Sequence, residues 1–180
     1  MEKWTDRIDR VTVDFIESFQ DLTQDEFNYK PTKDTWSIAQ NIDHLMVINQ
    51  SYFPLFEQLR NGSLLVSWVG KIGFMVSFMG KTILKSVQPD RRRKMRTFSI
   101  WEPTQIKLSK DILIQFKDHQ QILKQEIESC SELVSESVVI VSPANKNVIY
   151  RLETAFDIMI THEFRHLEQA KEVLAVLKTA

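Results

Sequence analysis

The sequence predicts an all-α protein built as a bundle of four helices, and three observations lead to this prediction. Four long segments place apolar residues three or four positions apart, which is the spacing of one face of an α-helix. The chain of 180 residues holds 4 glycines and 5 prolines, few for a protein with many turns. The connections between the segments are short to moderate, as in helical bundles. We expect one domain over residues 1–180, long enough to bury a core.

The first two helices are predicted over residues 5–19 and 38–61. The apolar positions of the first are Ile8, Val11, Phe15 and Phe19. The second begins with the pattern of a capping box, in which the Ser37 hydroxyl caps an early backbone N–H and the Gln40 side chain reaches back. It ends near Asn61, where an Asn-Gly pair is a typical C-terminal cap.

The last two helices are predicted over residues 104–128 and 146–177, and Pro103 introduces the third. Between them, residues 138–141 have the composition of a strand. A single strand has no partner in a helical bundle. We therefore interpret these residues as an extended segment that runs along the bundle.

The stretch from Leu64 to Leu84 is rich in Phe, Met, Ile, Val and Gly. A transmembrane helix needs about 20 apolar residues with few charges, and Lys71 and Lys81 interrupt this stretch. We expect no membrane span here. We interpret the stretch as a buried excursion over the helix ends or as a surface for a partner, and it is where a homodimer contact would be sought.

Composition narrows the classes of function. The formal net charge of −1 gives no global field for nucleic acid. The single cysteine, Cys130, excludes an internal disulfide and is compatible with a reducing cytosol. The charged N-terminus has no apolar run behind it, unlike a signal peptide, so we expect a cytoplasmic protein. The basic run that contains Arg91, Arg92 and Arg93 is either a solvated loop or a site for a carboxylate or phosphate.

Three histidines are the strongest functional signal. His162 and His166 lie four residues apart, so both imidazoles share one helix face, and steps of four and three from Val148 place them on the buried stripe. His44 lies in another helix. Such a set can hold a metal ion with a position open to water or substrate. The alternative is a set of core histidines bonded to carboxylates or carbonyls, since an unpartnered buried imidazole costs roughly 1–3 kcal/mol.

Other polar residues near these histidines have weaker signals. His119 has polar neighbours, and we expect it at the surface or in a supporting position. The string from His162 to His166 formally matches the H-E-x-x-H pattern of metalloproteases, but Glu163 lies about 100° around the helix from His162 and cannot serve the same ion as a base. Asp43 and Asp157 are candidates to orient a ligating imidazole, although ordinary surface charge is the preferred interpretation of Asp43.

These residues also resemble a known family. The segment Trp36–Gln40 leading to His44, together with His162-x-x-x-His166, resembles the DinB-like superfamily of metal-binding helical bundles, which includes YfiT-like proteins and bacillithiol S-transferases. Residues 94–103 resemble the lead into the third helix of that family. The resemblance implies an up-down-down-up four-helix bundle, often dimeric. It also implies a divalent metal, commonly zinc or nickel, held by His44, His162 and His166.

Two kinds of reaction on a small-molecule substrate fit such a site. A divalent ion can lower the pKa of a bound water to about 7, which suits a hydrolase. The resemblance implies, for some members, a thiol-dependent S-transferase that uses a low-molecular-weight thiol, whose carboxylate Arg91, Arg92 or Arg93 could hold. Two other functions stay open: a non-catalytic metal-binding or stress-response protein, and a structural bundle with core histidines. Three imidazoles suit zinc and nickel alike.

Overall fold

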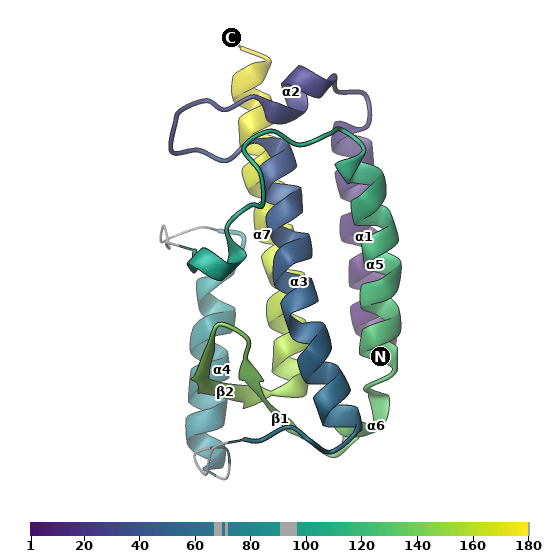
Figure 1. The fold of residues 1–180 in the computed structure, drawn as a ribbon, viewed down its shortest axis with the longest axis vertical. Coiled ribbons are helices and arrows are strands. Elements are labelled where there is room, and N and C mark those ends of the chain that lie inside the picture. The colour runs from purple at the N-terminus through teal and green to yellow at the C-terminus, as the bar shows by residue number, and fades with distance from the viewer. Residues whose placement is uncertain (67–69, 71, 91–96, 180) are drawn as a thin grey trace.

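Helices dominate the computed structural model, which describes residues 1–66, 70, 72–90 and 97–179. The four long helices lie side by side along the long axis of the molecule (Figure 1). They are α1 (Glu2–Phe19), α3 (Ile38–Arg60), α5 (Ile112–Glu128) and α7 (Leu152–Leu177). The shorter helical elements are α2 (Gln24–Asn28), α4 (Gly73–Ser86), the 3-10 turn η2 (Ser99–Trp101) and α6 (Ser131–Ser135). The predicted helical class is therefore confirmed, with one small sheet added.

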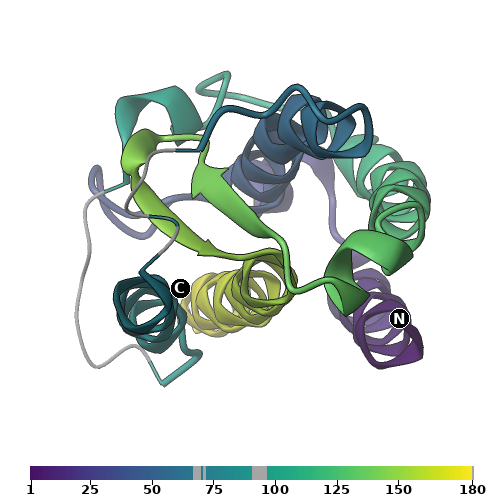
Figure 2. The same cartoon turned by 90° about the horizontal axis from the view of Figure 1, so that it is seen from below.

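The sheet is an antiparallel hairpin at one end of the bundle. Strand β1 (Val139–Ser142) pairs with β2 (Asn145–Arg151), with Ile140 opposite Tyr150. The expectation that residues 138–141 form an unpaired extended segment is wrong. They have a partner strand, and most of that strand lies in residues that the helical spacing of the sequence assigns to the fourth helix. That helix starts at Leu152 rather than at residue 146. Figure 2 shows the hairpin between α3 and α7, with α4 beside α7.

The third predicted helix is also shorter than expected, since α5 begins at Ile112 and not at residue 104. Side chains of α2 hold the residues in front of it. Asn28 Nδ2 donates to the carbonyl of Leu108, and Asn28 Oδ1 accepts from the Leu108 N–H, both at 2.8 Å. Gln24 Oε1 accepts from the N–H of Lys110 at 2.8 Å. These bonds satisfy backbone groups that a helix would otherwise pair internally.

The apolar stretch from Leu64 to Leu84 contains most of α4, whose inner face packs against α7 and β2. The expectation that this stretch is buried therefore holds for the inner face of α4 only. On its outer face, Phe74 and Phe78 are 77% and 70% exposed. Gly80 permits the close packing, since a Cβ there would lie 2.9 Å from Thr154 Cγ2. Among the described residues, no helix is long and apolar enough to cross a membrane.

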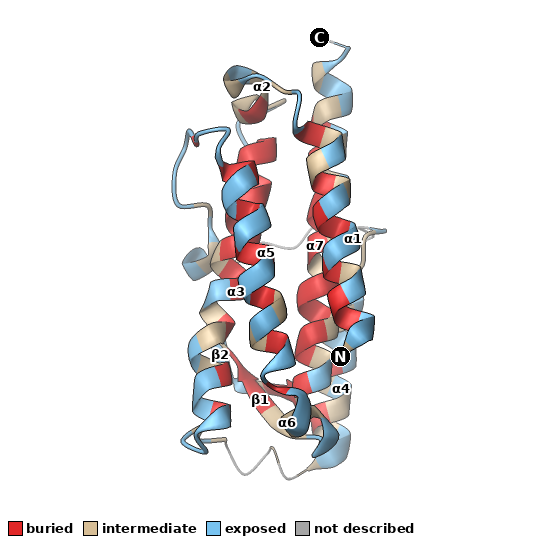
Figure 3. Ribbon diagram, turned by 90° about the vertical axis from the view of Figure 1, so that its right-hand side faces the viewer, coloured by how far each residue is buried: buried red, intermediate tan, exposed pale blue. Residues whose placement is uncertain are grey.

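Buried residues lie along the inward faces of the long helices (Figure 3). Their apolar side chains form two main clusters. One includes Trp4, Phe56 and Phe156, and the other includes Phe15 and Phe116. The clusters divide at the same level on each helix. On α7 the division falls between residues 160 and 167, the turns that carry the paired histidines. The bundle therefore has a polar layer inside an otherwise apolar core.

Glycine at position 80 gives a test of how α4 is attached. Replacing Gly80 by leucine forces a side chain against Thr154 and Tyr150, whose Cβ lies 3.1 Å from the Cβ position. We expect Gly80→Leu to lower the free energy of unfolding by about 1–3 kcal/mol through overpacking. The matched control is Gly73→Leu in the same helix, where nothing lies within 4 Å. Urea unfolding measures both, and equal stabilities would contradict the packing described.

Candidate metal centre

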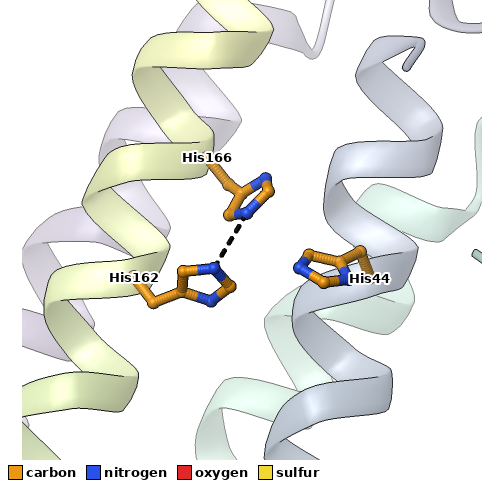
Figure 4. Close-up of side chains that lie close together, drawn as sticks. All are labelled: His44, His162 and His166. Carbon is orange, nitrogen blue, oxygen red and sulfur yellow. Dashed lines mark hydrogen bonds between the residues drawn. The ribbon is translucent and has the colours of Figure 1, made fainter. Parts of the chain in front are cut away.

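Three imidazoles from distant parts of the chain converge between α3 and α7 (Figure 4). One ring nitrogen from each of His44, His162 and His166 lies within 4.8 Å of the other two. The Nε2 atoms of His162 and His166 are 3.0 Å apart. Over the described part of the chain, these three form the only group of three or more His, Cys, Asp or Glu residues placed to hold a metal ion.

A backbone carbonyl fixes the ring of His44. Its Nδ1 bonds to the carbonyl oxygen of Trp101, and a carbonyl can only accept, so Nδ1 carries the proton. The Nε2 of a neutral ring then bears a lone pair. This Nε2 is buried and has no hydrogen-bond partner. Such an orphaned acceptor costs roughly 1–3 kcal/mol unless something binds it.

An amide side chain fixes the ring of His166 in the same way. Its Nδ1 lies 2.7 Å from Asn41 Oδ1 and 3.4 Å from Gln169 Nε2, and the shorter contact is the stronger. Asn41 Nδ2 donates to the carbonyl of Ser37 at 2.9 Å, so the amide oxygen is the atom that faces His166. His166 Nδ1 is therefore the donor, and its Nε2 lone pair points toward His162.

This donor set fits a divalent metal ion. Two Nε2 lone pairs, from His44 and His166, face a common space, and His162 Nε2 lies beside them. A cation at that point would satisfy the orphaned nitrogen of His44. Without it, His162 Nε2 and His166 Nε2 share a hydrogen bond of 3.0 Å, in which His162 is the donor (Figure 4). Three neutral imidazoles are ligands that zinc, nickel and related ions accept.

Burial favours the neutral form of two of these imidazoles, those of His44 and His162. It lowers the pKa of His44 to about 4, against a small opposing effect of the Trp101 hydrogen bond. The pKa of His162 lies well below its ordinary value, through burial first and then through repulsion from His44 and Arg165. Metal ions bind the neutral form of imidazole. Protons therefore compete little for the site at neutral pH.

Trp36, the residue in front of the capping box, covers one side of the cluster. Its ring centroid lies 4.6 Å from that of His44 and 5.9 Å from that of His166, nearly parallel to the latter. The predicted capping box of Ser37 and Gln40 is present, and it starts α3 directly after this indole. The helix start thus places an apolar cover on the site.

A cavity of about 1200 Å³ lies against the cluster and is lined by all three histidines. Its wall includes Trp36, Trp101 and residues of α4 and β2. Arg165, on α7, links that helix to the end of α4, because its Nη1 donates to the carbonyls of Ser86 and Gln88. The site is therefore open to a small molecule from one side and closed by an indole on another.

Glu163 faces away from the cluster, as the helical angle predicts. Its carboxylate accepts from Asn49 Nδ2 and Gln120 Nε2, both at 2.8 Å, and the side chain is fully buried. Burial raises its pKa to about 7, against the effect of these two bonds and of Arg7. The formal metalloprotease pattern therefore does not describe this site, since its glutamate would have to face the metal.

Some weaker expectations are wrong. His119 is 4% exposed rather than at the surface, and its ring stacks on Phe53. Asp157 accepts from Trp4 Nε1 and Asp43 accepts from Thr104 Oγ1, so these bonds do not join either carboxylate to an imidazole of the cluster. The preferred interpretation of Asp43 as surface charge is wrong as well, because this side chain is buried.

The residues that do orient the imidazoles differ in how far the sequence could reveal them. Asn41 lies three positions before His44 on the same helix, a signal that the sequence contained. The role of the Trp101 carbonyl could not be predicted from the sequence, because every residue has a backbone carbonyl. Arg91, Arg92 and Arg93 lie outside the described residues.

Comparison with known proteins adds one finding. A family model described as the DinB superfamily matches residues 7–170, which is most of the chain. No curated protein and no solved structure matches the chain in the same comparisons.

The raised pKa of Glu163 predicts a pH dependence of stability. Between pH 4.5, the ordinary value, and about 7, the unfolded state ionises while the folded state keeps its proton, so stability falls as pH rises and then levels off. This interval corresponds to about 3 kcal/mol. Glu163→Gln should remove that loss, because glutamine has no group that ionises. The variant should still fold, since Gln120 Oε1 has no partner and can accept from the new amide after a flip.

The measurement is the free energy of unfolding of both proteins from pH 4 to pH 8 in the presence of a chelator. The difference between them cancels the titration of the histidines. A constant difference across this range would show that Glu163 does not titrate as described.

Proposed function

We propose that this chain, which belongs to the DinB superfamily, is a metal-dependent enzyme of the hydrolase or thiol-dependent S-transferase type. In this proposal His44, His162 and His166 hold one divalent ion, zinc or nickel. The observation that carries it is the buried Nε2 of His44, which has no partner and faces the two imidazoles of α7. His119 Nε2 is also buried without a partner, but it is not part of any such ligand group among the described residues, whereas His44 Nε2 lies with two further imidazoles.

When bound, a divalent ion supplies Lewis acidity at an open position and lowers the pKa of a water or thiol there. The chain's own residues do the remaining work. Asn41 and the Trp101 carbonyl hold the rings of His166 and His44 in one tautomer. Trp36 excludes water from one side of the cluster. The cavity on the other side admits the substrate.

The size of the cavity favours S-transfer over hydrolysis. Sites for one small molecule usually measure about 300–1,000 Å³, and this cavity of about 1200 Å³ has room for a thiol and a second molecule. Lys30 and Lys33 line it and offer cations for a carboxylate of the thiol. The proposed role of Arg91, Arg92 and Arg93 in holding that thiol rests on their sequence alone.

Further features of the chain remain proposals. We propose one domain over residues 1–180 whose four long helices run up-down-down-up, supported by the contacts of α1 and of α3 with both α5 and α7. A cytoplasmic location is supported by the single cysteine, which burial keeps in its thiol form by raising its pKa. Two other functions compete: a non-catalytic metal-binding or stress-response protein, and a structural bundle with core histidines.

A homodimer through the outer face of α4 is a further proposal, supported by the exposed rings of Phe74 and Phe78 one turn apart. Large apolar side chains at such a surface favour protein contacts. We expect the double change of both residues to serine to shift the mass measured by light scattering from dimer to monomer. Ile114→Ser, at an exposed position of α5, is the control and should change nothing. A wild-type monomer would overturn this proposal.

Metal content is the test of the proposed function. We expect about one transition-metal ion per chain, lost in His44→Ala, His162→Ala and His166→Ala, because two imidazoles hold an ion far less well than three. His119→Ala is the matched control: it also removes a buried imidazole, outside the cluster, and should keep its metal. Metal-free wild-type protein after incubation with zinc and nickel would leave the core-histidine bundle as the remaining function.

Turnover separates the enzyme from the non-catalytic protein. Metal-loaded protein should conjugate a low-molecular-weight thiol to a chromogenic electrophile, or hydrolyse an activated ester, and His162→Ala should do neither. Full metal occupancy without either reaction for glutathione, cysteine, bacillithiol or the esters would favour the metal-binding or stress-response protein.

A further inference from the structure

The cavity extends from the histidine cluster toward the hairpin end of the molecule. Helix α3 starts beside α2 and runs toward the hairpin, and α7 starts at the hairpin and runs back (Figure 1). Positions after His44 on α3 and before His162 on α7 therefore lie on the hairpin side. Tyr52 is eight residues beyond His44 and Met159 is three before His162, so each shares a face with its histidine.

This part of the cavity, which we call the lower chamber, has an apolar wall. Its apolar lining residues are Ile48, Ile83, Val87, Val148, Ile158 and Met159. Ile83 and Val148 are neither fully buried nor exposed, as expected for side chains that line a cavity. The lysines that line the cavity, Lys30 and Lys33, belong to the segment between α2 and α3 at the opposite end.

Two tyrosines close the chamber at the hairpin. The hydroxyl groups of Tyr52 and Tyr150 are 2.6 Å apart, and both side chains are at most 3% exposed. Burial raises the pKa of both, so both stay neutral at physiological pH. The other polar side chains of the hairpin that line the cavity, Ser142 and Asn145, are uncharged too. One charged side chain, Arg165, lines the cavity at the level of the histidines, between His162 and His166 on α7, where its Nη1 donates to the carbonyls of Ser86 and Gln88. From that level toward the hairpin, the lining side chains named above offer hydrogen bonds and no charge.

We propose that the lower chamber binds the uncharged, mainly apolar body of the substrate and directs its reacting group to the histidine cluster. The substrate class is a neutral hydrophobic molecule with at most a single hydroxyl, carbonyl or amide at its far end, where the tyrosine pair lies. A charged group would lose its hydration there and gain no partner, whereas an apolar body gains from leaving water. This inference rests on the proposed function in one respect only, namely that the group of the substrate that faces the histidine cluster is the one that reacts.

Binding of fluorescent probes to the metal-loaded, full-length protein tests the proposal. The probes are neutral N-phenyl-1-naphthylamine and its sulfonated counterpart, 8-anilinonaphthalene-1-sulfonate. We expect the neutral probe to bind at least tenfold more tightly. Ile83→Asp and Val148→Asp should weaken its binding at least tenfold, since each places a charge in the chamber. Val13→Asp, at an exposed site of α1 that does not line the cavity, should leave it unchanged.

A second variant guards against misfolding by the aspartate substitutions. Val148→Thr keeps the shape of the side chain and replaces a methyl group by a hydroxyl, and it should weaken binding of the neutral probe by two- to fivefold. Equal affinities in wild type, Val148→Thr and Val13→Asp would overturn the proposal. Tighter binding of the sulfonated probe would overturn it as well, and so would no binding of the neutral probe up to its solubility limit.

The two proposals fail separately in these experiments. Metal content is measured on every variant and should stay at the wild-type value in all the chamber variants. His162→Ala should lose its metal and still bind the neutral probe within threefold of wild type. Loss of probe selectivity with metal retained would remove the substrate class alone, and probe selectivity without any metal would remove the proposed function alone.

Discussion

A carboxylate buried between three helices sets the register on which the site depends. Glu163 of α7 accepts from Asn49 of α3 and from Gln120 of α5 at the level where the two apolar clusters divide. His44 lies five residues before Asn49, about 7.5 Å along its helix, and His166 lies about 4.5 Å beyond Glu163 in the same direction, since α3 and α7 run opposite ways. The pairing of Asn49 with Glu163 thus brings His44 near the level of His166, and His162 lies about one turn further toward the hairpin.

Much of this arrangement could be predicted from the sequence because it is local. The spacing of His162 and His166 determines that they share a face, and the capping box at Ser37 determines where α3 begins. The outward direction of Glu163 from the cluster follows from the same helical angle. These conclusions need no knowledge of how the helices pack, and the structure agrees with all of them.

Features that depend on packing could not be predicted in the same way. Residues 145–151 continue the helical spacing of α7, yet they pair with β1 because a tight turn brings the two segments together. His119 has polar neighbours in sequence, and its burial depends on the face of α5 that meets Phe53. The partner of His44 is a backbone carbonyl from a connection far along the chain, which no residue type marks.

The position of the bound metal tests the central claim most directly. A crystal of protein incubated with zinc or nickel, measured at the absorption edge of that metal, locates the ion through its anomalous scattering. We expect one strong peak per chain within coordination distance of the Nε2 atoms of His44, His162 and His166, with the Trp101 and Asn41 hydrogen bonds retained. A structure without a peak there, in which His44 Nε2 has found a hydrogen-bond partner in the protein, would contradict the account.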